Sequence, residues 1–133
     1  MENLMIDLGA VEYRIPGGGS VRFNPTDPNV YSRFLGLEEE LAVLQKNIQQ
    51  EAKLCSSGSQ VLQMLESADK ALKASLNRVF PGNNFHEALG CVNLLAQAGD
   101  KTVAESLLSA LEQVLSDGAK RLAGKEAEAL LQG

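Results

Sequence analysis

The chain has 133 residues, a formal net charge of −5 at pH 7 and 5% aromatic residues. This length predicts a single domain over residues 1–133 with a modest core. The acidic balance argues against nucleic-acid binding, which needs basic side chains to neutralise phosphates, and no apolar run approaches the ~20 residues of a membrane span.

The N-terminus lacks the basic start and the long apolar segment of a secretory signal. Cys55 and Cys91 are too few for a disulfide framework and are predicted to be buried apolar residues of a reducing compartment. We therefore expect a cytoplasmic protein that binds neither a membrane nor nucleic acid.

Residues 4–24 predict a β-hairpin. Val11, Tyr13 and Ile15 alternate with polar residues, the period of a half-buried strand. The Pro-Gly-Gly-Gly run at 16–19 predicts a turn, and 20–24 the return strand. Keeping the apolar residues on one face requires a loop of three or five residues. The facing pairs are then Tyr13 with Val21, Val11 with Phe23, and Glu12 with Arg22 as an exposed ion pair.

Two questions about this hairpin stay open in the sequence. Leu4, Ile6 and Leu8 have the opposite parity to Val11, so either a bulge at residues 9–10 restores one face or the strand begins only at Ala10. A two-stranded hairpin is marginal alone. It must therefore lie on its own helices or add its edge to a sheet in another subunit. Because of the second alternative, we expect a homo-oligomer.

Apolar residues at spacings of three and four predict helices over 28–54, 60–79, 85–98 and 102–122, with a C-terminal extension over 123–133. The predicted caps are Asp27 with Pro28, then Ser59, then Asn84 with Glu87, then Thr102 with Glu105. Gly99 should end the third helix, and Gly118 should end or bend the fourth. The fold class is thus mainly α with a small β part (α+β): an N-terminal hairpin followed by a bundle of about four helices.

The first helix carries a heptad-like stripe, too short to require a coiled coil, at Phe34, Leu37, Leu41, Leu44 and Ile48. On the second helix, Asp69 and Lys73 are four residues apart in the favourable order. Such a pair contributes a few tenths of a kcal/mol at most.

The search for catalytic or metal-binding residues finds little. His86 is the only histidine and lies in the first turn of a predicted helix. No Cys or second His stands at metal-ligand spacing, and the glycines at 17–19 lack the Lys-Ser/Thr of a phosphate-binding loop. We expect a protein that is not an enzyme and needs no cofactor or metal.

Three segments carry a resemblance to a known family, and the order in which they follow one another matters more than any single motif. The segments cover residues 22–31 (Arg-Phe-Asn-Pro-Thr-Asp-Pro-Asn-Val-Tyr), 76–80 (Leu-Asn-Arg-Val-Phe) and 92–95 (Val-Asn-Leu-Leu), and residues 110–121 also fit. In this order the chain resembles the tail assembly chaperones of long-tailed phages and prophages of Firmicutes. The resemblance covers most of the chain and contains no catalytic motif.

The resemblance implies a protein that binds the apolar helical tape measure protein and helps to recruit tail tube subunits in the host cytoplasm. A structural minor tail or connector protein and a regulatory protein-binding module are the alternative functions. Strand addition and a helix in a groove are the two contact modes available to such a fold. We expect self-association through Tyr13, Val21 and Phe23, and an apolar groove formed by Phe34, Phe85, Leu89 and Val92.

Overall fold

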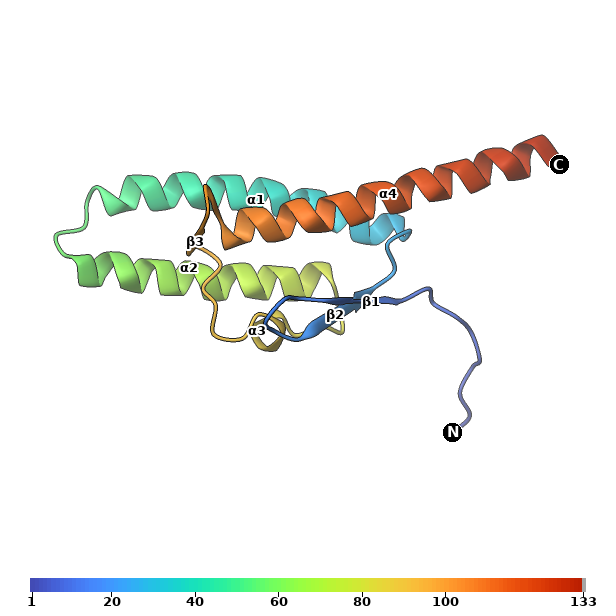
Figure 1. Ribbon diagram of the computed structural model, residues 1–133, viewed down its shortest axis with the longest axis horizontal. Helices are drawn as coiled ribbons and strands as arrows, with labels where there is room; N and C mark the ends of the chain where they lie inside the picture. Colours follow the sequence, from blue (N-terminus) through green and yellow to red (C-terminus); the bar gives the residue numbers. More distant parts are fainter. Residues whose placement is uncertain (133) are drawn as a thin grey trace.

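The computed structural model describes the backbone of residues 1–132 and the side chains of residues 1–125. The helical hairpin of α1 (Pro28–Ala52) and α2 (Gly58–Val79) is the frame of the fold, and α4 (Val103–Gln132) lies along α1 in the opposite direction (Figure 1). The smaller elements are β1 (Val11–Arg14), β2 (Ser20–Phe23), α3 (Phe85–Ala88), β3 (Gln97–Ala98) and β4 (Lys101–Thr102). Helices account for more than half of the chain, with a small β-hairpin near the N-terminus, so the predicted α+β class is confirmed.

The first helix begins where its cap predicts. The Asp27 carboxylate accepts the Asn29 N–H at 2.9 Å, and Pro28 takes the first helical position, where its missing donor costs nothing. Helix α2 begins two residues earlier than predicted, because Ser57 rather than Ser59 is its cap and accepts the Gln60 N–H. Helix α1 ends at Ala52 instead of residue 54.

The hairpin has the predicted register, with Val11 opposite Phe23 and Tyr13 opposite Val21 across a five-residue loop at 15–19. The strand begins only at Val11, and residues 1–10 form no strand. The predicted ion pair with Arg22 is absent, because Glu12 accepts the Ser20 hydroxyl at 2.7 Å instead.

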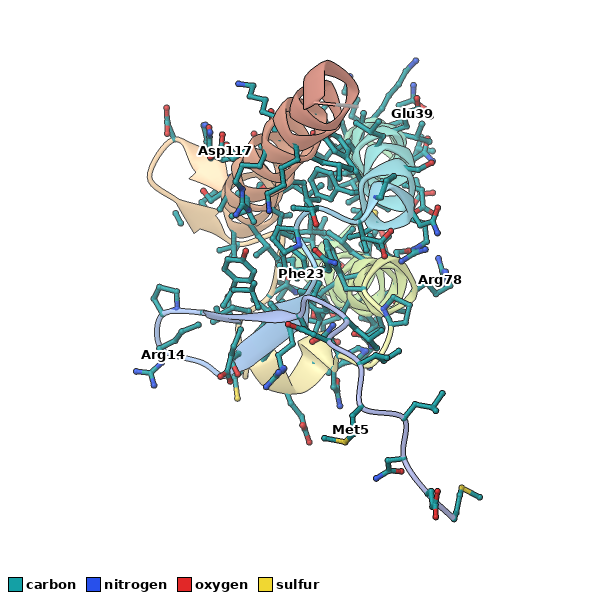
Figure 2. All side chains as sticks on the ribbon, turned by 90° about the vertical axis from the view of Figure 1, so that its right-hand side faces the viewer. Met5, Arg14, Phe23, Glu39, Arg78 and Asp117 are labelled. Atoms are coloured by element: carbon teal, nitrogen blue, oxygen red, sulfur yellow. The ribbon has the colours of Figure 1, made fainter. Side chains whose placement is uncertain are left out.

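Aromatic residues from distant parts of the chain meet in the middle of the core. Phe80 lies 4.7 Å from Phe23, 5.8 Å from Phe85 and 6.4 Å from Phe34, measured between ring centroids. Phe34, Phe80 and Phe85 are completely buried. This cluster joins the hairpin, α1, the end of α2 and α3, and in Figure 2 Phe23 lies in the interior between the hairpin and the helices.

The helix predicted over 85–98 is wrong beyond its first turn. Asn84 caps it as expected, accepting the N–H groups of His86 and Glu87, but α3 ends at Ala88. The following residues form turns and then the small β3–β4 hairpin. Its two-residue turn begins with Gly99 at φ 74°, a conformation that favours glycine. Gly99 therefore turns a hairpin and does not end a helix.

Helix α4 neither ends nor breaks at Gly118. Thr102 accepts the Glu105 N–H at 3.1 Å as the predicted cap, and the helix continues to Gln132. A side chain at Gly118 would overlap the carbonyl oxygen of Pro25, so the glycine permits α4 to approach the residues before α1. Most of the predicted extension over 123–133 is thus the end of α4, and residue 133 lies outside the described part.

Candidate functional site

The seven residues predicted to bind other proteins divide into three groups. Tyr13, Val21 and Leu89 line one groove between the hairpin and α4. Tyr13 is half-buried, whereas Val21 and Leu89 are core residues that form the floor of this groove with 2% and 6% of their surface exposed. Phe23, Phe34 and Phe85 are buried in the core and do not line this groove. Val92 is 46% exposed but stands apart from both sets, above α2.

The groove beside the hairpin, called here the hairpin groove, has a volume of about 400 Å3. Tyr13, Ile15 and Val21 form its hairpin wall. The α4 wall consists of Val103, Ser106, Leu107, Ala110, Leu111 and Val114. Arg14 is the only charged residue in its lining among the side chains of residues 1–125, and in Figure 2 Arg14 lies at the outer end of the hairpin.

One edge of the hairpin is covered and the other is open. On the β2 side, the Asn83 amide group pairs with the Arg22 backbone, accepting its N–H at 2.7 Å and donating to its C=O at 2.9 Å. Antiparallel strands alternate in the direction of their polar groups. The N–H and C=O groups of Glu12 and Arg14 therefore point away from β2, and no backbone partner for them is present within residues 1–132.

A second apolar groove, here the α1–α4 groove, was not predicted from the sequence. It has a volume of about 460 Å3 and lies between the start of α1 and the C-terminal half of α4. Its apolar lining residues are Pro25, Pro28, Tyr31, Leu35, Ala119, Leu122 and Ala123. Leu35 lies off the heptad-like stripe and is 48% exposed. A leucine outside the stripe is the one feature of the sequence that indicates apolar surface at this position.

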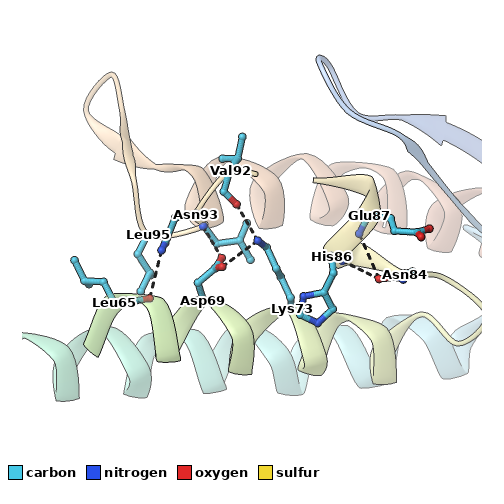
Figure 3. A network of polar contacts seen from close by, with 10 residues as sticks. Leu65, Asp69, Lys73, Asn84, His86, Glu87, Val92, Asn93 and Leu95 are labelled. Atoms are coloured by element: carbon cyan, nitrogen blue, oxygen red, sulfur yellow. Dashed lines mark hydrogen bonds and ion pairs between the residues drawn. The ribbon is translucent and has the colours of Figure 1, made fainter. Parts of the chain in front are cut away.

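The pair formed by Asp69 and Lys73 is buried and holds a loop (Figure 3). The Lys73 ammonium lies 2.9 Å from the carboxylate and donates to the Val92 carbonyl at 2.9 Å. The other oxygen of Asp69 accepts the Leu94 N–H at 2.8 Å. The pair is therefore not the weak helix pair predicted from its spacing, but a clamp that fixes the chain after α3 against α2.

The groups considered for chemistry lie apart. His86 is exposed at the start of α3, and Cys91 is exposed in the turns that follow α3. Cys55 is half-buried, so the prediction that both cysteines are buried is wrong. Among the side chains described, no three His, Cys, Asp or Glu residues gather as metal ligands would.

One carboxylate pair spans the contact between α1 and α4. Partial burial and the neighbouring Glu112 carboxylate, which is both a hydrogen-bond partner and a like charge, raise the pKa of Glu38. This pair places two like charges side by side where α1 and α4 meet.

Within residues 1–132, no helix has both the length and the apolar character required to cross a membrane. Comparisons of the chain with protein-family models, with curated proteins and with solved structures give no match.

Proposed function

We propose that this protein is a non-enzymatic tail assembly chaperone of a long-tailed phage or prophage. In this role it binds the tape measure protein in the host cytoplasm, helps to recruit tail tube subunits, and acts as a homo-oligomer. The proposal starts from the resemblance of residues 22–31, 76–80 and 92–95 to that family.

The observation that carries the proposal is the uncovered α1–α4 groove. Pro28 and Leu35 present exposed apolar surface on its α1 side, and the half-buried Leu122 lines it from α4. A groove between two helices suits the apolar face of a third helix, which is the recognition mode expected for a long helical client. The C-terminal part of α4 extends past the start of α1, which lengthens this side of the molecule (Figure 1).

The test is coexpression of the full chain with the tape measure protein of the same phage genome, followed by affinity capture and quantification of the complex. Leu35→Glu would introduce a charge into the α1–α4 groove. Because burying a leucine contributes about 1.5–3 kcal/mol, we expect this variant to bind at least about tenfold more weakly.

The matched control is Leu62→Glu, which changes a leucine that is 65% exposed on α2 and lies outside both grooves. It should bind the tape measure protein as the unmodified chain does. Equal weakening by both substitutions, or no capture by the unmodified chain, would overturn the proposal. Detection of the protein in mature virions would favour the structural tail component instead.

A further inference from the structure

We propose that the N-terminal segment of one copy of this chain adds as a strand to β1 in the hairpin groove of a second copy. The inference rests on the homo-oligomeric part of the proposed function and names the two surfaces that meet. The donor is residues 3–8, and the acceptor is the open edge of β1 together with the α4 wall of the groove.

The acceptor lacks a strand on one side only. Asn83 occupies the β2 edge, whereas the outward N–H and C=O groups of Glu12 and Arg14 line up along the β1 edge. An edge strand with unpaired polar groups is a template for another extended chain. The apolar residues of α4 stand beside this edge, so an added strand would gain both backbone bonds and apolar contacts.

The donor has the matching pattern. Leu4, Ile6 and Leu8 stand at every second position, the spacing of one face of a strand, and are 68–86% exposed. Three large apolar side chains exposed together in this way are unusual. Covering such a segment would remove a large apolar area from water. No side chain within residues 1–125 covers these three residues.

Length and charge agree between the two surfaces. Val103 and Val114 are eleven residues apart on the α4 wall, which corresponds to about 16 Å of helix. The five steps from Asn3 to Leu8 span about 17 Å as a strand. The donor residues 3–8 carry one charged side chain, the acidic Asp7, whereas Arg14 is the only charged residue among the described side chains that line the hairpin groove.

The donor segment of each copy is directed away from its own groove. The Asn24 amide donates to the Leu8 carbonyl at 3.0 Å, and the Gly9 N–H donates to the Asp7 carboxylate at 2.8 Å. The first contact holds the segment near the C-terminal end of β2, the second is local to the segment, and Figure 1 shows the segment leaving the body of the molecule. The open edge of a second copy is therefore the acceptor. Because donor and acceptor differ, the contact is heterologous and can repeat from copy to copy.

The direct test is crosslinking between two full-length copies of different size in a Cys55→Ser/Cys91→Ser background. One copy carries Ile6→Cys and the other Ala110→Cys, an exposed position in the groove lining. We expect a mixed disulfide dimer. The control pairs Ile6→Cys with Ser109→Cys, which is also exposed but lies outside the lining, and should give much less product. Equal yields, or closure within a single chain that carries both Ile6→Cys and Ala110→Cys, would overturn the inference.

Mass measured by light scattering over a range of concentrations gives an independent test. Ile6→Asp should weaken self-association about tenfold or more, whereas Asn3→Asp, which adds the same charge at a polar position, should not. Glu12→Pro removes an N–H that the fold itself does not use, and it should also weaken the association, whereas Glu12→Ala should not. An unmodified chain that stays monomeric overturns the inference.

The two proposals fail separately. Ile6→Asp leaves the α1–α4 groove intact, so its capture of the tape measure protein isolates client binding from self-association. Crosslinking without capture of the tape measure protein rejects the chaperone function and supports the strand contact. Capture without crosslinking supports the chaperone function and rejects the strand contact.

Discussion

Removal of the ammonium from the buried clamp tests how the chain after α3 is held. In Lys73→Met the side chain keeps a similar length but loses its bonds to Asp69 and to the Val92 carbonyl, each 2.9 Å long. Loss of one partner from a buried ion pair costs about 3–5 kcal/mol, because the other charge stays buried without compensation. The Lys73 and Asp69 side chains are 7% and 13% exposed, so solvent can compensate only in part.

We expect a loss near the lower end of that range, about 3 kcal/mol, because Asp69 keeps the Leu94 N–H as a partner and methionine adds apolar contact. For a chain of this length such a loss lowers the melting temperature by roughly 10 °C. Urea and thermal unfolding followed by circular dichroism would measure it. Hydrogen exchange at the Leu94 amide should also become faster in the folded state, because the loop opens locally.

The matched control is Lys70→Met, which removes an exposed lysine from the same helix. Its effect should stay within about 0.5 kcal/mol, as for most surface substitutions. If Lys73→Met and Lys70→Met change the unfolding free energy equally, the pair is an ordinary surface pair and the reasoning about the clamp is wrong.

Two further substitutions test the position of α4. Helix propensity alone predicts that Gly118→Ala raises the unfolding free energy by up to ~1 kcal/mol, but overlap with the Pro25 carbonyl predicts a loss of about 1–3 kcal/mol. The control Gly124→Ala places a methyl group where no atom lies within 4 Å, so it should show the stabilisation without the loss. Urea unfolding curves of both variants measure whether the unfolding free energy rises or falls. Because the pKa of Glu38 is raised in the folded chain, the folded state holds this proton more tightly than the unfolded state, and stability falls as the pH rises through the raised pKa. Glu38→Gln should therefore raise the melting temperature at pH 7 by relieving repulsion from Glu112, and this gain should shrink as the pH falls through the raised pKa; a gain that is constant with pH would contradict the argument.

The hairpin wall of the candidate site can be predicted from the sequence, because it depends on the alternation of side chains within two short strands. Tyr13 and Val21 were placed on one face by the alternation of the strands, and both line the hairpin groove. The prediction that Phe23, Phe34 and Phe85 contact other proteins is wrong, because the sequence pattern of an aromatic residue is the same whether it lies in the core or on a contact surface. Phe34 and Phe85 are core because the tertiary fold brings them to Phe80, the residue after α2, and into the common apolar cluster.

The hairpin register, the helix starts at Asp27 and Asn84 and the mainly helical class followed from the sequence, because they depend on alternation and on side chains that bond to backbone groups a few residues away. The chain after α3 did not follow from it. There the apolar spacing favours a helix, but the buried charges of Asp69 and Lys73 take up backbone groups that a helix would use for itself. Such a buried pair is stable only with every partner in place, so the three-dimensional packing of α2 against this loop, and not local preference, decided its course.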